Sequence, residues 1–267
     1  MKRFFRKKCL AAVIFAAMIT ILGICGCTRR TAAARYPGDY ETAEVNGVSI
    51  CYEIVGEGDP VILLHGNGGS HEDLSLITEQ LAAAGYRAYA VDSRGQGANA
   101  PLDEYHYTDM ADDVYQLIKL WGLTKPALYG WSDGGIVGLL TEIRHPGSLG
   151  ALAVSGANIS PDGLDGSFLM SVKLSDAVHE DPLTTMILTE PDITEEELAG
   201  ITCPVLVTAG SGDIIREDHT RQIAEAIPGS QLIIFDGESH GSYITGNTKM
   251  AEALITFLEE IKCFGFE

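Results

Sequence analysis

The sequence has little positive charge. Its 267 residues hold 18 Lys and Arg against 37 Asp and Glu, which gives a net charge of −19 at pH 7. Binding of nucleic acid needs clustered basic side chains, and no such cluster follows residue 30. The composition therefore argues against a nucleic-acid partner.

Cysteine is also scarce in the body of the chain. After residue 30 the thiols are Cys51, Cys203 and Cys263. An odd number of widely separated cysteines predicts neither a disulfide framework nor a metal site. The sequence also lacks a repeat of fixed period, which excludes solenoid and collagen-like folds. Its 46% hydrophobic and 21% charged residues are typical of a packed globular protein.

A long uncharged apolar run lies near the start of the chain. Five basic residues occur between Met1 and Lys8, and the apolar run follows from Cys9 to Cys27. A basic stub before an apolar stretch shorter than the ~20 residues of a spanning helix is typical of a secretory signal.

The end of this run, Ile24-Cys25-Gly26-Cys27, resembles a bacterial lipobox. We therefore predict a lipoprotein-type signal peptide over residues 1–26, lipidation of Cys27, and a linker over residues 27–38. The protein is then expected outside the cytoplasm, held to the cell membrane by its N-terminal lipid. An uncleaved membrane anchor and ordinary secretion are the alternatives, because Cys25 is unusual in that pattern.

From residue 48 onward, apolar runs of strand length alternate with helical patterns. This alternation predicts an α/β fold, a mostly parallel sheet with helices on both faces, as one domain over residues 39–267. Strands are expected at Val48–Val55, Val61–Leu64, Arg87–Asp92, Ala127–Tyr129, Ala151–Ser155, Val205–Ala209 and Gln231–Phe235. Helices are expected at Asp73–Ala84, Thr108–Trp121, Asp133–Arg144, Asp218–Ile227 and Lys249–Ile261.

The alternation is interrupted once, by an insertion at about residues 157–200. This stretch is rich in Pro, Gly and acidic residues, with weak helical patterns at Ser167–Val178 and Glu195–Ala199. It is too long for a plain loop, so we expect a small lid over the site. A disordered acidic excursion is the alternative.

A Gly-x-Ser-x-Gly pentapeptide, Gly130-Trp131-Ser132-Asp133-Gly134, follows a predicted strand and opens a predicted helix. In this setting the glycines relieve crowding at a tight turn, and the serine projects above the sheet as a nucleophile. The pentapeptide alone also occurs by chance. Its position between strand and helix makes Ser132 the candidate nucleophile.

The serine needs a base, and the base needs an acid to orient it. His240 lies just after the last predicted strand, where open α/β sheets carry reactive groups. Asp213 follows the strand before it and is the preferred acid, with Asp236 as the rival. Asp92 is expected to stabilise a turn. The other histidines have plainer roles, and those expected in exposed polar stretches are His71, His106, His179 and His219.

The order Ser132, Asp213, His240 resembles that of the α/β-hydrolase superfamily. Two further motifs strengthen the resemblance, His65-Gly66-Asn67-Gly68-Gly69 and Asp92-Ser93-Arg94-Gly95. It implies the α/β-hydrolase fold with a short lid inserted after the sixth strand. One departure is Gln96, where relatives usually have His.

The resemblance also implies an esterase-like reaction through an acyl-enzyme. Ser132 attacks the acyl carbonyl, His240 accepts its proton, and Asp213 orients the histidine. The backbone amides of Asn67 and Asp133 form the oxyanion hole, and His65 is structural. No cofactor or metal is implied, the partner is a small-molecule ester, and the oligomeric state is left open.

Trp131 and Asp133 are expected to contact the substrate. A carboxylate at the start of a helix can simply favour the helix, but beside a developing oxyanion it opposes the reaction by ~1–4 kcal/mol at about 4 Å. The segment Gly130–Ile136 resembles valacyclovir hydrolase-like enzymes, in which the corresponding Asp binds the α-amino group of amino-acid esters. We therefore expect a preference for such esters. Lactones, thioesters, C–C bonds of diketones, and a non-catalytic surface-tethered binding protein remain alternatives.

Overall fold

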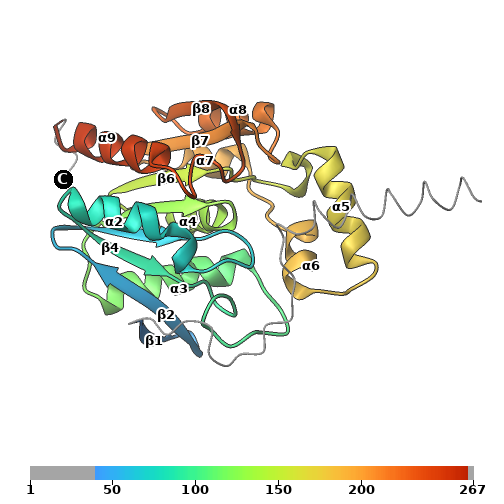
Figure 1. Cartoon of the computed structure of the whole chain (residues 1–267), viewed down its shortest axis with the longest axis horizontal. Helices are drawn as coiled ribbons and strands as arrows, with labels where there is room; N and C mark the ends of the chain where they lie inside the picture. Colours follow the sequence, from blue (N-terminus) through green and yellow to red (C-terminus); the bar gives the residue numbers. More distant parts are fainter. Residues whose placement is uncertain (1–39, 264–267) are drawn as a thin grey trace, which may run out of the picture. The chain divides into compact units, whose positions relative to one another are not determined.

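A computed structural model of the chain describes residues 40–263 (Figure 1). Within these residues, eight strands form one sheet in the order β1-β2-β4-β3-β5-β6-β7-β8. The pairs β1–β2 and β2–β4 are antiparallel, and all other neighbours are parallel. The strands are β1 Glu41–Val45, β2 Val48–Val55, β3 Asp59–Leu64, β4 Tyr86–Val91, β5 Ala127–Trp131, β6 Ala151–Ser155, β7 Val205–Gly212 and β8 Gln231–Ser239.

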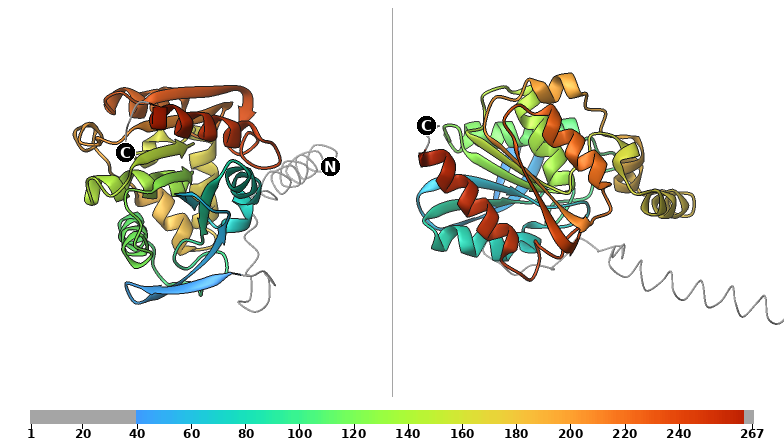
Figure 2. Two further views of the ribbon diagram at one scale, coloured as in Figure 1. Left: turned by 90° about the vertical axis from the view of Figure 1, so that its left-hand side faces the viewer. Right: turned by 90° about the horizontal axis from the view of Figure 1, so that it is seen from above.

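Helices cover both faces of the sheet (Figure 2). One face packs against α2 and α9, and the opposite face packs against α3, α4 and α8. The helices of the two faces are α2 Ser75–Ala83, α3 Tyr107–Leu120, α4 Asp133–Arg144, α8 Glu217–Ala226 and α9 Lys249–Cys263, and the short helix η1 His71–Leu74 precedes α2. The predicted α/β-hydrolase fold is thereby confirmed.

Because helices cover both faces of the sheet, its inner strands contain uninterrupted apolar runs. In β3 the four consecutive residues Val61–Leu64 are all buried, because alternate side chains point to opposite faces and each face meets helices. On α3, Met110, Val114 and Leu117 recur at helical spacing and pack into one hydrophobic cluster with the sheet.

Several predicted bounds agree with the structure residue by residue, among them β2, β6 and α4. Strand β1 was missed. It is a short edge strand in which three of five residues are exposed, so the hydrophobic signal is weak. The Asn46-Gly47 pair that joins it to β2 has positive φ at both residues, as a two-residue hairpin turn requires, and could have revealed it.

The insertion holds helices and is not a structureless excursion. Its elements are η2 Pro161–Gly163, α5 Gly166–Asp176, α6 Pro182–Thr189 and α7 Glu195–Ala199. Two of them match the predicted helices, whereas α6 was missed. The start of the insertion is paired with the β7–α8 loop through an isolated antiparallel bridge between Leu164 and Ile215.

The predicted signal peptide, the lipidation site Cys27 and the linker over residues 27–38 lie outside the described residues. Among the helices of residues 40–263, none combines the length and the apolar character needed to cross a membrane.

Candidate active site

The turn from β5 into α4 places Ser132 in a strained conformation. Its φ of 56° and ψ of −118° are unfavourable for a residue with a Cβ. The turn is fixed by a hydrogen bond from Ser132 N to Ser155 O of β6, 2.7 Å long. A Cβ on Gly130 would overlap the carbonyl of Gly134, and a Cβ on Gly134 would overlap that of Leu64. Both positions of the motif therefore need glycine.

His240 and Asp213 are 27 positions apart in the sequence and in direct contact in the structure. His240 Nδ1 lies 2.6 Å from Asp213 Oδ1. The same carboxylate oxygen accepts the Ile215 backbone N–H at 3.0 Å, and the Asp213 side chain is 1% exposed against 18% for His240. The rival, Asp236, is exposed. Of the two, Asp213 is the one that contacts the ring.

The serine turn and the histidine–aspartate pair lie side by side, with Gly156 between them. A Cβ on Gly156 would lie 2.8 Å from Nδ1 and Cε1 of His240 and 3.2 Å from Asp213 Oδ2. Trp131 Nε1 donates to the carbonyl of His240 at 3.0 Å. Within residues 40–263 no direct hydrogen bond joins Ser132 Oγ to His240, and catalytic hydrogen bonds of this kind often form only in the substrate complex.

The loop after β3 passes beside the serine. A Cβ on Gly66 would lie 3.2 Å from Ser132 Cβ, so this glycine allows the close approach. The next turn of the loop is fixed by Gln96, whose Oε1 accepts the Gly68 N–H at 2.7 Å. The departure at Gln96 thus supplies an acceptor that holds the loop containing Asn67.

His65 is a buried structural residue. Its Nε2 accepts the Ser93 backbone N–H at 3.0 Å, so the proton of the neutral ring lies on Nδ1, which is 2.7 Å from Gly66 O. The ring therefore joins the loop after β3 to the loop after β4.

The loop after β4 is organised by Asp92, which is fully buried. One oxygen accepts from both N and Nδ1 of His71, at 2.6 and 2.8 Å, and the other accepts from Ala98 N at 2.7 Å. Burial raises the pKa of Asp92, but the contributions that lower it, led by the hydrogen bond with His71, outweigh burial and hold the pKa below its ordinary value. Asp92 therefore stabilises this loop, as predicted, and its hydrogen bonds go to His71 and Ala98 and not to His240.

The prediction that His71 and His219 are exposed is wrong. Both are buried, His71 against Asp92 and His219 under the start of the insertion. His219 Nε2 accepts the Ile159 backbone N–H at 3.0 Å, and burial lowers the pKa of this histidine. The polar sequence around these two histidines did not reveal the contact of His71 with the Asp92 carboxylate or that of His219 with the Ile159 backbone.

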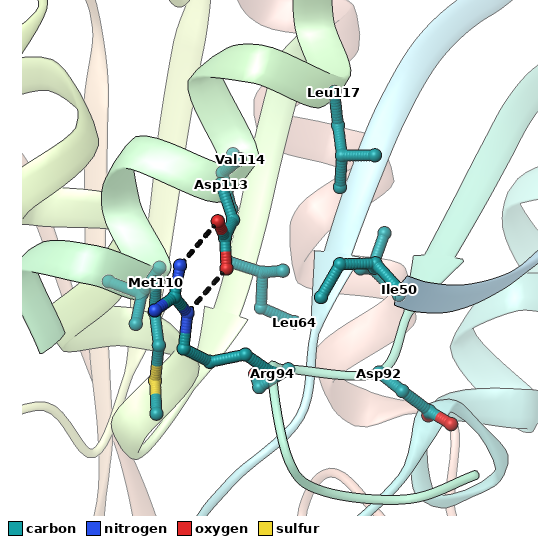
Figure 3. A pocket seen from close by; sticks show the side chains of 11 residues that line it. Ile50, Leu64, Asp92, Arg94, Met110, Asp113, Val114 and Leu117 are labelled. Carbon is teal, nitrogen blue, oxygen red and sulfur yellow. Dashed lines mark hydrogen bonds and ion pairs between the residues drawn. The ribbon is translucent and has the colours of Figure 1, made fainter. Parts of the chain in front are cut away.

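Arg94 stabilises the structure around the site and is not one of its proposed reactive residues. Figure 3 shows it in a small pocket, with its guanidinium facing Asp113 of α3. The pair is bidentate, with Nε and Nη2 at 2.6 and 2.7 Å from the two carboxylate oxygens. Neither Ser132 nor His240 lines this pocket. The ion pair fixes the loop after β4 to α3.

Asp133, the residue after the nucleophile, carries a buried carboxylate that is 6% exposed. Asn67 Nδ2 donates to its Oδ2 at 2.8 Å, and the Tyr107 hydroxyl donates to its Oδ1 at 2.9 Å. Burial raises the pKa of Asp133, against these two hydrogen bonds, which lower it. Asn67 and Asp133, the two predicted oxyanion residues, are thus joined to each other. Tyr107 was missed, because nothing in its helix pattern marks it.

Comparisons with known proteins support the fold in which this site lies. The family model for the alpha/beta hydrolase fold matches residues 59–175. Human serine hydrolase BPHL is 27% identical over 232 residues, which cover 75% of this chain and 79% of that protein. The AB hydrolase superfamily protein YisY of Bacillus subtilis is 26% identical over 256 residues, covering 79% of this chain and 95% of that protein.

A solved structure gives the same result for the fold. The esterase EaEST from Exiguobacterium antarcticum superposes with a TM-score of 0.70 at 23% identity, covering 83% of this chain and 99% of that one. At this identity the likeness concerns the fold alone.

Proposed function

Because the chain has the α/β-hydrolase fold and is similar to hydrolases of that superfamily, we propose that it is a serine hydrolase that cleaves small carboxylic esters. The observation that carries the proposal is the position of the Ser132 turn. Its Trp131 side chain donates to the His240 carbonyl, and its backbone is hydrogen-bonded to Ser155, next to the Gly156 that lies against the His240–Asp213 pair. A strained serine next to an oriented imidazole is the arrangement that nucleophilic acyl transfer requires.

In the proposed reaction, Ser132 Oγ attacks the acyl carbonyl while His240 Nε2 takes the hydroxyl proton. The Asp213 carboxylate keeps Nδ1 protonated and stabilises the imidazolium that forms. The amides of Asn67 and Asp133 donate to the oxyanion, and one such donor is typically worth ~2.7–4 kcal/mol in the transition state. The alcohol leaves with the proton from His240, and water then hydrolyses the acyl-enzyme.

A fluorophosphonate probe tests the nucleophile directly. We expect the wild-type protein to form one covalent adduct, located on Ser132 by peptide mass spectrometry, because only an activated serine attacks such phosphorus centres. Ser132→Ala should abolish labelling, whereas the control Ser175→Ala, at an exposed serine of α5, should leave it unchanged. Labelling that persists in Ser132→Ala, or a wild type that is not labelled, contradicts the proposal.

We further propose that Asp133 favours esters with an α-ammonium group. Alanyl and isobutyryl esters of one alcohol form a matched pair, since an ammonium group replaces a methyl group of similar size. We expect Asp133→Asn to lower the alanyl-to-isobutyryl ratio of kcat/KM about tenfold, the loss of a hydrogen bond to a charged group. A ratio that is equal in the two proteins would show that the carboxylate does not sense the ammonium.

A further inference from the structure

The structure points to Tyr107 as a second determinant of substrate charge. We propose that its hydroxyl holds the Asp133 carboxylate in place as an ionised receptor for a substrate ammonium, an inference that rests on the proposed function. Tyr107 is the first residue of α3, is 1% exposed, and donates to Asp133 Oδ1 at 2.9 Å. Its aromatic ring packs in the hydrophobic cluster that includes α4.

The contacts of Asp133 suit a receptor for a cation. Each carboxylate oxygen accepts one hydrogen bond from an uncharged donor, Asn67 or Tyr107. No Lys or Arg of the part of the chain that the structure describes forms an ion pair with Asp133. Uncharged donors fix and stabilise a carboxylate without cancelling its charge, and each oxygen keeps a further lone pair. Among the described residues, the negative charge of Asp133 is therefore not paired with a basic side chain, as a receptor for a substrate ammonium requires.

Tyr107 and Asn67 differ in what else they do. Asn67 belongs to the loop whose backbone is proposed to bind the oxyanion, so its replacement disturbs the reaction for every substrate. Tyr107 comes from α3, which carries none of the groups proposed to react. Removal of the tyrosine hydroxyl therefore alters Asp133 and leaves the proposed nucleophile, base and acid in place.

The insertion fixes the position of Tyr107. Glu190, which follows α6, accepts the Tyr107 backbone N–H through Oε2 at 3.1 Å. Its Oε1 lies 2.5 Å from His106 Nδ1. Through the residue that follows α6, the insertion is thus attached to the start of α3, at the residue whose side chain reaches Asp133.

The balance of burial and hydrogen bonding explains why the hydroxyl matters. Burial raises the pKa of Asp133, and the hydrogen bonds from Asn67 and Tyr107 lower it, together with the nearby His65 and His240. Burial also raises the pKa of Tyr107 well above its ordinary value, so its hydroxyl stays a donor throughout the working pH range. Without that donor the carboxyl protonates at higher pH, and a protonated carboxyl no longer attracts an ammonium group.

Kinetics of Tyr107→Phe test the inference. We expect kcat/KM for the alanyl ester to fall about tenfold at pH 7 and that for the isobutyryl ester to stay within twofold, because the neutral acyl group does not use the charge. The matched control is Tyr52→Phe. Tyr52 also donates its hydroxyl to a carboxylate, that of Glu41 at 3.0 Å, but at the β1–β2 edge of the sheet. It should change neither ester.

Thermal unfolding gives a readout that does not depend on turnover. A carboxyl whose folded pKa lies above its unfolded value makes the folded state less stable as pH rises between the two values. Tyr107→Phe raises the folded pKa further, so its loss in melting temperature should be larger at pH 8 than at pH 4.

The outcomes separate this inference from the proposed function. Equal losses for both esters, or a melting loss for Tyr107→Phe that is the same at pH 4 and pH 8, would assign Tyr107 a merely structural role. A wild-type ratio near one between kcat/KM for the alanyl ester and kcat/KM for the isobutyryl ester would contradict the proposed ammonium receptor. The proposed ester hydrolysis would be unaffected by that result. A wild type that cleaves no ester overturns the proposed function, and the melting comparison still decides whether Tyr107 keeps Asp133 charged.

Discussion

Replacement of Asp213 by Asn is expected to lower kcat for ester hydrolysis about 10⁴-fold without unfolding the protein. The carboxylate accepts from His240 Nδ1 at 2.6 Å, so it selects the tautomer in which Nε2 is free to take the serine proton. An amide can present its NH₂ group to Nδ1 and stabilise the other tautomer, which leaves Nε2 protonated and unable to act as a base. In serine hydrolases this change typically costs about four orders of magnitude in kcat.

Steady-state kinetics of Asp213→Asn and Asp236→Asn check this expectation. Asp236 was the rival acid and lies only four positions before His240, but its side chain is exposed. Asp236→Asn should therefore leave kcat within twofold of the wild type. Equal melting temperatures for the three proteins show that lost activity is not lost structure. If Asp236→Asn were the inactive variant, the acid would be misassigned.

The position of the three proposed reactive groups could be predicted because it follows from chain topology. Ser132, Asp213 and His240 each follow the carboxyl end of a parallel strand, β5, β7 and β8 respectively. Carboxyl ends of parallel strands meet at one edge of a sheet, so residues far apart in sequence come together there. The predicted strands were strongly apolar and short, and they ended two, three and four residues before the observed ends of β5, β7 and β8, because the last residues of these strands are less apolar.

The surroundings of these groups could not be predicted in the same way. The buried His71, the buried His219 and the donor Tyr107 are defined by contacts to distant backbone or carboxylate atoms. Such contacts produce no periodic pattern of apolar residues in the sequence. The helix α6 was missed for a related reason, since only Met186 of its eight residues is buried and an amphipathic pattern hardly develops.

Gly156 directly follows a predicted strand, but its closeness to the His240 ring could not be predicted from the sequence. It follows β6, the strand between the one that ends at the serine turn and the one that leads to Asp213. Its φ is +58°, and an added Cβ would lie 2.8 Å from two atoms of the His240 ring. We expect Gly156→Ala to lower kcat by about 10²-fold, because displacing a catalytic group by about 1 Å costs that much.

The control for Gly156→Ala is Gly147→Ala. Gly147 also has a positive φ, +79°, but an added Cβ there meets no atom within 4 Å. Both substitutions carry the same left-handed backbone cost of about 1–2 kcal/mol in the free energy of unfolding. Only Gly156→Ala should lose activity, measured as kcat at a temperature where both variants are folded. Equal kcat values for the two variants would mean that His240 tolerates the added methyl group, and that the space beside it is not what requires glycine after β6.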